Sequence, residues 1–520
     1  MHLQKIQHQL LKMLNQIRAT KLWWLIGLIL IGAFLRFYRV SHTLLFAGDQ
    51  GRDALRVVRI WQQGDLPLIG PVTSIGNMYL GPLYYYFMLP WLLLSYPSPV
   101  GPAYGVALLS ILTIWLFYRL GKEMIGAVGA GLAAGMFVFS NVAVEYARFS
   151  WNPNPAPLFS LILIWALYRF FKGNHRYLIL VALAFSILIQ LHYMALLSAF
   201  PIILVWGYVV WQVSTKQPKK VTKLIQSSIL AIVVVSVFLI PLIVFDIKHQ
   251  GVNLQALSRL MGGETSITEF DVTVTSWGEK IIRILGETHG RAMFILVDNY
   301  FGVNRAVNTF LALIVIGATV WSLRRHKLPS GPTLLSLFVL VGIVGTSFYS
   351  HSLYQHYILF LLPPVFLLIG WLLAQAFSHS KWGKGLVLVF LSWFLIFNVQ
   401  KYPFHDFSPG LSQLQRDTQI IAEDLSPGER YNVVLISESK DYYAQNYRYY
   451  FNTIANKAPV DPSFDDITAV ETLVIINELK LSVDELIRLG IYEIEIFKDA
   501  SVKKELTLPS GTHAMIWHKQ

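Results

Sequence analysis

Cysteine is absent from the 520 residues, and only 14% of them are charged, against about a quarter in a typical soluble domain. Without cysteine the chain cannot form disulfide bonds, thiolate metal sites or a cysteine nucleophile. The scarcity of charge argues against a water-soluble fold for the chain as a whole. Sequence repeats are also missing, which removes the usual sign of a transporter built from two similar halves.

Hydrophobic residues are abundant instead and make up 54% of the chain. Apolar stretches of about 20 residues, long enough to cross a ~30 Å hydrocarbon core, recur along residues 1–400. We therefore predict an all-α polytopic membrane domain in this part. Lys and Arg outnumber Asp and Glu by 42 to 30. Such an excess is expected where cytoplasmic loops hold the orientation of a membrane protein, and we do not expect nucleic-acid binding.

Clusters of basic residues predict the topology, because Lys and Arg beside short loops stay in the cytoplasm. The clusters are the N-terminal arm up to residue 21, Arg119 with Lys122, Lys172 with Arg176, residues 216–223, residues 324–327, and Lys381 with Lys384. The segments 41–79, 145–157, 192–193, 247–305 and 350–357 then share the outer face. We expect a retained first span, a cytoplasmic N-terminus and a multi-pass protein of the plasma or inner membrane.

Residues 80–120 decide the number of crossings. If residues 80–96 and 100–120 both crossed fully, every later loop would invert and the basic clusters would lie outside. Prolines at 82, 90, 97, 99 and 102 would break or kink helices here, which permits a re-entrant or partly inserted pair. We expect about 11 crossings, with about 13 as the alternative.

The composition changes after residue 400, where apolar runs shorten and charges return. Residues 432–437, 472–476, 492–497 and 514–518 are predicted as short strands, and residues 411–425, 441–454 and 483–489 as helices. This alternation predicts a small soluble α/β domain over residues 401–520, on the extracytoplasmic face. It contains no glycine-rich phosphate loop, so we expect no catalysis from it.

The outer segment after the first span carries the most chemistry. It reads GDQGRD at residues 48–53 and continues as an amphipathic helical pattern to Gln63. A carboxylate between a membrane helix and an interfacial helix lies at the depth of a lipid phosphate, which suits catalysis on a lipid-linked substrate. Asp49 could instead cap the following helix, since Asp is a favoured N-cap residue.

The second outer loop combines a carboxylate, a guanidinium and aromatic rings within residues 145–153. Arg148 can give two parallel hydrogen bonds to phosphate oxygens, and Trp151 offers a flat apolar surface to a sugar ring or an isoprenoid. A donor that carries both a phosphate and a sugar needs this mixture. The alternative is an interfacial aromatic belt with an ion pair between Glu145 and Arg148.

Histidines recur on the same face, at positions 192, 249, 351 and 356. Imidazole and carboxylate can ligate divalent cations, and Glu145 and His356 are the candidate ligands if a metal ion is used. Each histidine could equally form only hydrogen bonds to carbonyls at a helix end. His356 is the favoured candidate because, with Tyr357, it opens directly onto an apolar span.

Three motifs occur in order on this face: GDQGRDA at residues 48–54, GPLYY at 81–85 and EYAR at 145–148. In this order they resemble the dolichyl- or polyprenyl-phosphate-sugar-dependent transferases, which include protein O-mannosyltransferases and lipid A aminoarabinose transferases. The resemblance covers most of residues 1–400 and implies a GT-C fold and a lipid-phosphate-linked sugar donor. It also implies that Asp49 acts as general base or orients the acceptor. The family more often has Asp-Glu where this chain has Asp49-Gln50, so Asp53 is the nearest substitute for the second carboxylate.

We predict a membrane glycosyltransferase that transfers a sugar from a polyprenyl-phosphate donor to an acceptor hydroxyl on the extracytoplasmic face, with inversion implied by the resemblance. Asp49 and Asp53 are the candidate catalytic residues. The candidate donor-binding residues are Arg52, Tyr84, Glu145, Arg148, Trp151, His192, His356 and Tyr357. The expected partners are the lipid donor, a lipid, glycan or protein acceptor, and the membrane, and a divalent metal ion is the one cofactor considered. The alternatives are a ligase or polymerase of lipid-linked oligosaccharide, and a transporter or flippase of lipid-linked glycans.

Overall fold

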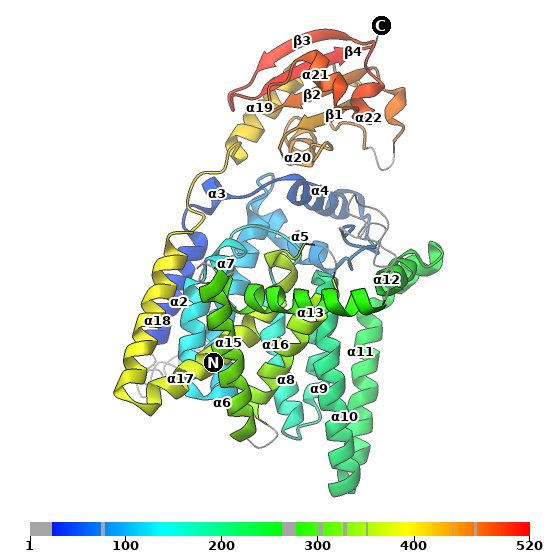
Figure 1. Cartoon of the computed structure of the whole chain (residues 1–520). Coiled ribbons are helices and arrows are strands. Elements are labelled where there is room, and N and C mark those ends of the chain that lie inside the picture. Colours follow the sequence, from blue (N-terminus) through cyan, green and yellow to red (C-terminus); the bar gives the residue numbers. More distant parts are fainter. Residues whose placement is uncertain are drawn as a thin grey trace, which may run out of the picture.

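The computed structural model of the chain describes residues 23–73, 78–262, 277–298, 300, 305–325, 330–349, 352–438, 440–461 and 465–519. The basic N-terminal arm, His351, and parts of the cluster at 324–327 and of the outer loop 247–305 lie outside these residues. Within the described ranges, a helical bundle is followed by a small C-terminal sheet with its own helices (Figure 1). A helical membrane fold with a C-terminal α/β part was expected from the sequence.

Apolar helices form the bundle, and five helical stretches among the described residues are long and apolar enough to cross a membrane. Six shorter apolar helices accompany them. The bundle helices are α2 (Trp23–Phe37), α5 (Leu83–Ser95), α6 (Gly101–Phe139), α8 (Ala156–Phe171), α9 (Tyr177–Leu191), α10 (Ala199–Lys216), α11 (Val221–Lys248), α15 (Arg305–Arg325), α16 (Gly331–Ser347), α17 (Leu362–His379) and α18 (Lys381–Val399). Other helical segments connect them: α3 (Val40–Thr43), α7 (Asn141–Glu145), η1 (Tyr193–Ser198), η2 (Pro218–Lys220), α12 (Val252–Gly262), α13 (Trp277–Met293), η3 (Phe294–Asp298) and η4 (Gln355–Leu361).

Burial separates the central helices of the bundle from the peripheral ones. Most of α17 is buried, and it packs against α6, α8, α16 and α18. In contrast, α11 exposes a row of isoleucine, leucine and valine side chains along its length. Such a surface is stable only in an apolar solvent, so α11 has the character of a lipid-facing helix. The chain is a membrane protein, as its composition predicts.

Two antiparallel arms make up α6. The chain reverses at Gly126, whose φ of 82° and ψ of 164° are readily adopted only by glycine. The rings of Phe117 and Phe137, one from each arm, consequently lie 4.9 Å apart between their centroids. Arg119 and Lys122, one of the predicted cytoplasmic clusters, lie close to this reversal in the sequence.

One amphipathic helix, α4 (Gly48–Gln63), lies across one end of the bundle, between the membrane helices and the C-terminal sheet (Figure 1). Its buried residues include Gly51, Asp53, Ala54, Val57 and Val58. Their spacing of three and four residues places them on a continuous face, as the helical period requires. We call this end of the bundle the α4 face.

Among its described residues, the C-terminal part is a four-stranded sheet of order β1-β2-β4-β3 with four α-helices and one 3₁₀ helix. Its elements are α19 (Leu411–Glu423), β1 (Tyr431–Ile436), α20 (Gln445–Thr453), η5 (Ile467–Ala469), β2 (Thr472–Asn477), α21 (Val483–Arg488), α22 (Tyr492–Glu495), β3 (Ser501–Thr507) and β4 (His513–His518). β1 and β2 are parallel, with Tyr431 opposite Thr472, and the other two pairings are antiparallel. The parallel strands β1 and β2 are buried throughout, although β1 lies at one edge of the sheet.

One of the four predicted strands is wrong. Residues 492–497 form the short helix α22 and the turn after it, which bury Ile494 and Phe497 in the core. The remaining strand is β3, which is exposed along nearly its whole length and carries Lys503, Lys504 and Glu505. An exposed edge strand with charged side chains lacks the apolar alternation by which strands are recognised in a sequence.

Both ends of α5 lie near the α4 face. Its 13 residues span about 20 Å, less than the ~30 Å of a hydrocarbon core. Near its start, the Tyr85 hydroxyl donates to Oδ1 of Asp53 in α4 at 3.4 Å. Just beyond its end, the Tyr449 hydroxyl of α20 donates to the carbonyl oxygen of Pro97 at 2.9 Å. A short helix with both ends near one face agrees with the partly inserted arrangement considered for residues 80–96, and the number of crossings stays a prediction.

Candidate active site

A cavity of about 230 Å³ lies at the α4 face. Six of the ten site residues predicted from the sequence line it: Asp49, Arg52, Trp151, His192, His356 and Tyr357. They come from α4, from the loop after α7, from the end of α9 and from η4, segments far apart in the sequence. The rest of the wall is mostly apolar and includes Leu80, Leu191, Met194, Leu196 and Leu257.

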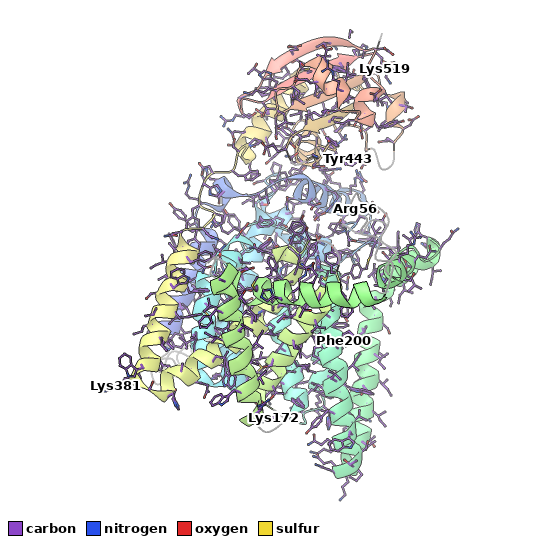
Figure 2. The ribbon with its side chains drawn as sticks, in the orientation of Figure 1. Arg56, Lys172, Phe200, Lys381, Tyr443 and Lys519 are labelled. Carbon is purple, nitrogen blue, oxygen red and sulfur yellow. The ribbon has the colours of Figure 1, made fainter. Side chains whose placement is uncertain are left out.

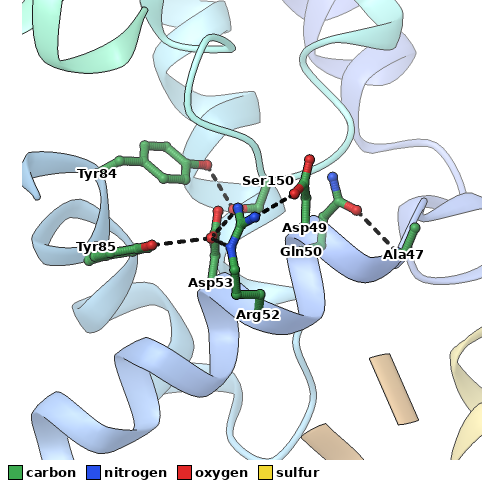
Figure 3. Close-up of polar contacts among 8 residues, drawn as sticks. All are labelled: Ala47, Asp49, Gln50, Arg52, Asp53, Tyr84, Tyr85 and Ser150. Carbon is green, nitrogen blue, oxygen red and sulfur yellow. Dashed lines mark hydrogen bonds and ion pairs between the residues drawn. The ribbon is translucent and has the colours of Figure 1, made fainter. Parts of the chain in front are cut away.

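Asp49 and Arg52 are one helical turn apart on α4, and their side chains pair (Figure 3). The helix begins at Gly48, with Ala47 as the N-cap residue, and the Gln50 side-chain oxygen accepts the Ala47 N–H at 3.1 Å. Asp49 is therefore not the helix cap, and Gln50 performs that function in the first turn. The Asp49 carboxylate remains 45% exposed towards the cavity and is available to a substrate.

Asp53 lies beneath this pair with a side chain that is only 1% exposed. Its Oδ1 accepts from Nε of Arg52 at 3.0 Å, from Nη2 of Arg52 at 2.8 Å and from the Tyr85 hydroxyl. Its Oδ2 has no hydrogen-bond partner among the described residues. Burial raises the pKa of Asp53 to about 6 despite the neighbouring Arg52. The free Oδ2 is where the proton of the neutral acid would reside.

Aromatic and imidazole rings form the opposite wall. Centroids are 4.4 Å apart for Trp151 and His356, and 4.7 Å apart for His192 and Tyr357. Burial, and secondly the nearby His356, lowers the pKa of His192 to about 3, so its imidazole is neutral at physiological pH. Because Nδ1 of His192 accepts the N–H of Met194 at 3.2 Å, the proton of the neutral ring resides on Nε2. His192 is thus a hydrogen-bond donor without a charge.

The other predicted site residues do not line the cavity. Arg148 is buried and donates to the carbonyl oxygens of Leu35 and Tyr38 at 2.9 and 2.7 Å and to the Thr43 hydroxyl. These bonds tie the second outer loop to the end of the first span and occupy the guanidinium that was expected to bind phosphate. Tyr84 is buried, with its hydroxyl 2.7 Å from that of Ser150.

Glu145 also lies outside the cavity lining. Burial raises the pKa of Glu145, and His405 is the charged neighbour that opposes this effect. No ion pair joins Glu145 to Arg148 among the described residues, because Arg148 is bonded to carbonyl oxygens at the end of the first span. The second outer loop therefore does not contain the Glu145–Arg148 ion pair that was considered as an alternative.

Asn152 is a cavity residue that was not predicted. It is only 2% exposed and lines the cavity, yet neither atom of its side-chain amide has a hydrogen-bond partner among the described residues. A buried amide without partners costs free energy, so this group is suited to accept and donate hydrogen bonds to a polar ligand. In the sequence, the only hint of this role is the position of Asn152 between Trp151 and Pro153. An asparagine at such a position could equally serve only to form a turn.

The described residues contain no group of three or more His, Asp or Glu side chains arranged to hold a metal ion. The candidates Glu145 and His356 do not meet at one cavity wall, because only His356 lines the cavity. Among the described residues, Glu145 and His356 therefore do not form a common cation site, and no catalytic step below depends on one.

Known proteins share both sequence and fold features with this chain. The family model of dolichyl-phosphate-mannose-protein mannosyltransferases matches residues 81–240. ArnT from Cupriavidus metallidurans in the apo state aligns with a TM-score of 0.56 and 11% identity, over 96% of this chain and 98% of that one. The same protein bound to undecaprenyl phosphate gives a TM-score of 0.54 and 13% identity over 95% and 98%.

A second type of enzyme has a similar fold. The Archaeoglobus fulgidus oligosaccharyltransferase, in a complex with Zn and sulfate, aligns with a TM-score of 0.51 and 13% identity, over 94% of this chain and 72% of that one. No curated protein matches the sequence significantly. The chain thus has the GT-C fold and is similar, over residues 81–240, to the dolichyl-phosphate-mannose-protein mannosyltransferases, which confirms the resemblance expected from its three motifs.

Proposed function

We propose that this protein transfers a sugar from a polyprenyl-phosphate-linked donor to an acceptor hydroxyl at the α4 face, outside the cytoplasm. The observation that carries the proposal is the convergence of Asp49, Arg52, His192 and an unpartnered Asn152 in one cavity beside the apolar bundle. The similarity of the fold to ArnT, whose structure contains undecaprenyl phosphate, supports a lipid-phosphate donor. The family match supports the transfer of a sugar.

In this proposal Asp49 is the general base. Its Oδ1 accepts from Nη1 of Arg52 at 2.7 Å, which fixes the plane of the carboxylate and leaves the second oxygen for the acceptor hydroxyl. The base takes the hydroxyl proton while the acceptor oxygen attacks the anomeric carbon and the bond to the lipid phosphate breaks. The departing phosphate needs no protonation, because a phosphate monoester is a stable anion.

The donor phosphate is assigned to the side of the cavity that bears hydrogen-bond donors. His192 presents Nε2–H without the cost of burying a second charge, and Arg52 supplies the positive charge. Trp151 offers a flat ring to the sugar, and the buried amide of Asn152 matches a sugar hydroxyl, which can both donate and accept. The leucine wall suits the first isoprenoid units of the lipid.

The proposal is tested by incubating the purified protein in liposomes with radiolabelled polyprenyl-phosphate sugars and crude envelope acceptor. Released polyprenyl phosphate together with labelled acceptor is the expected result, and Asp49→Asn should abolish both. Consumption of only lipid-pyrophosphate oligosaccharides would identify the ligase alternative. Movement of intact donor across the bilayer without cleavage would identify a flippase and overturn the proposal.

A further inference from the structure

The C-terminal part packs directly on α4, the helix that carries Asp49. Figures 1 and 2 show α20 facing α4, with Tyr443 and Arg56 on the two sides of the junction. At Gly51 the two backbones approach so closely that an added Cβ would lie 2.5 Å from the carbonyl oxygen of Gln445 and from the amide nitrogen of Asn446. Because these are backbone atoms at the start of α20, no side-chain rotation could relieve the contact.

Further contacts extend this junction on both sides of Gly51. The ring of Phe46 lies 5.5 Å from that of Tyr449, between centroids. Arg59 forms an ion pair with Asp461 of the C-terminal part. The Tyr449 hydroxyl is bonded to Pro97 after α5. Four separate contacts therefore hold α20 and its neighbouring loops in one position relative to α4.

This position brings a third carboxylate to the beginning of α4. A Cβ added to Gly48 would lie 1.6 Å from Oδ2 of Asp441, so the Asp441 carboxylate occupies the space beside the residue that precedes Asp49. Burial raises the pKa of Asp441, the nearby Asp49 raises it further, and Arg52 and Arg448 oppose this effect. Asp441 thus interacts electrostatically with both members of the Asp49–Arg52 pair.

We propose that Asp441 is a positioning residue of the α4 site, supplied by the docked C-terminal domain, and that its negative charge acts on the neighbouring Asp49–Arg52 pair. This inference rests on the function proposed above. The Arg52 guanidinium pairs with Asp49 and Asp53, and the Asp441 carboxylate lies beside Gly48 at the start of the same helix. Like charges that lie close together oppose the ionisation of one another. Arg448 also faces Asp441 from α20, and His356 faces Asp49 across the cavity.

The consequence is that docking of the C-terminal domain and the charge of the site are coupled. With the domain in place, the negative charge of Asp441 lies beside the start of α4 and acts on the Asp49–Arg52 pair. Without it, Asp49 and Arg52 would form a simple exposed ion pair with Asp53 beneath. The C-terminal domain, from which we expected no contribution to catalysis, would then act on the reaction through Asp441.

The first test is the pH dependence of kcat/KM for Asp441→Asn, compared with Asp499→Asn, an exposed carboxylate of the same domain. Removing the charge at 441 should move the acid limb of the profile to lower pH by about one unit, with little change in the donor KM. Asp499→Asn should leave the profile unchanged. An unshifted acid limb in a well-folded Asp441→Asn protein would overturn the inference.

A second measurement does not require activity. Because the chain has no cysteine, Arg59→Cys with Asp461→Cys gives a unique pair for a short thiol cross-linker that reports docking. Gly51→Ala should reduce cross-linking several-fold, whereas Gly27→Ala, where a Cβ meets no atom within 4 Å, should not. Gly48→Ala should also reduce it, and Asp441→Ala in the same chain should restore it by removing the clashing carboxylate. Normal cross-linking in Gly51→Ala and Gly48→Ala would refute the docking contact.

The two proposals can fail separately. If the wild-type protein transferred no sugar, the proposed function would be wrong, and the effect of Asp441 would then be judged from protein stability alone. Because burial and the nearby Asp49 raise the pKa of Asp441, the wild-type protein should lose more thermal stability than Asp441→Asn as the pH rises. An identical pH dependence of unfolding in the two proteins would refute the electrostatic role independently of any donor.

Discussion

The Arg52 guanidinium donates to Oδ1 of Asp49 at 2.7 Å across one turn of α4 and binds the buried Asp53 with two further hydrogen bonds. One cation thus orients an exposed carboxylate and neutralises a hidden one. Asp49 and Asp53, the two acids of the GDQGRD motif, therefore have different roles. Asp49 can meet a substrate, and Asp53 can only influence Arg52.

Asp49→Asn should reduce turnover by about 10²- to 10⁴-fold, the usual contribution of a general base. Asparagine keeps the shape and can still accept from Arg52, so the melting temperature should hardly change. Asp65→Asn is the matched control, because Asp65 forms a similar pair with Arg56 at 2.6 Å just after α4, away from the cavity. Near-normal turnover of Asp49→Asn together with an inactive Asp53→Asn would move the catalytic role to Asp53.

Asp53 should make the protein less stable as the pH rises. Its pKa is about 6 in the folded protein, against 3.8 for an unperturbed aspartate, so the folded protein holds the proton more tightly between these values. Its contribution to stability is therefore complete below the lower pKa and is lost as the pH rises through the higher one, by about 3 kcal/mol. Asp53→Asn, which mimics the neutral acid, should lack this loss. The check is the difference in melting temperature between the two proteins from pH 4 to pH 7.5, which should grow with pH.

Asn152→Ala should raise the donor KM about tenfold, as expected for the loss of roughly one hydrogen bond to substrate. Stability of the unliganded protein should stay constant or rise, because an unpartnered buried amide is removed. Asn154→Ala is the contrasting variant. Its side-chain nitrogen donates to the carbonyl oxygen of Phe149 at 2.8 Å, so it should lose stability and keep its donor KM. Equal behaviour of the two variants would remove Asn152 from the site.

Arg148→Lys should destabilise the protein without affecting the use of donor. Lysine cannot reach the Leu35 and Tyr38 carbonyl oxygens and the Thr43 hydroxyl together, and the expected cost is about 1.5–3 kcal/mol. Arg56→Lys, at a partly exposed ion pair, should cost less than about 1 kcal/mol. A raised donor KM with unchanged unfolding behaviour would instead support the phosphate-binding role predicted from the sequence.

The C-terminal domain should lie outside the cytoplasm. Tyr443 in this domain and Lys381 at the start of α18 are at opposite ends of the molecule (Figure 2). In the cysteine-free chain, Tyr443→Cys should react with a membrane-impermeant thiol reagent in intact spheroplasts. Lys381→Cys should react only after the membrane is permeabilised. The reverse pattern would invert the topology and place the cavity in the cytoplasm.

The α/β part shows how far local sequence patterns reach. The strands β1 and β2 were predictable because continuous apolar runs mark buried strands. β3 was missed because an edge strand is exposed and carries charges, and residues 492–497 were misassigned because their apolar residues alternate in a segment of only six residues. Alternation over so short a segment fits one helical turn as well as a strand.

The site residues likewise include some that the sequence could indicate and some that it could not. Asp49, Trp151, His192 and His356 could be proposed from the sequence because each lies where an apolar span ends. The sequence could not show that Arg148 binds backbone oxygens whereas Asn152 lines the cavity. The hydrogen-bond partners of a guanidinium or an amide depend on which polar atoms the folded chain places beside it. The contribution of Asp441 depends on a contact between residues almost 400 positions apart in the sequence.

The sequence by itself determined that this protein lies in a membrane, where the apolar helices give way to the α/β part, and which segments between the apolar spans are rich in polar residues. These properties follow from hydrophobicity and charge, which act on each segment separately. Only the tertiary structure decided which polar groups face the cavity and which form hydrogen bonds between loops. It also decided how the C-terminal domain packs against α4. The physical reason is that hydrogen bonds and ion pairs act over a few ångströms, so a side chain acquires its role only when the folded chain sets its neighbours.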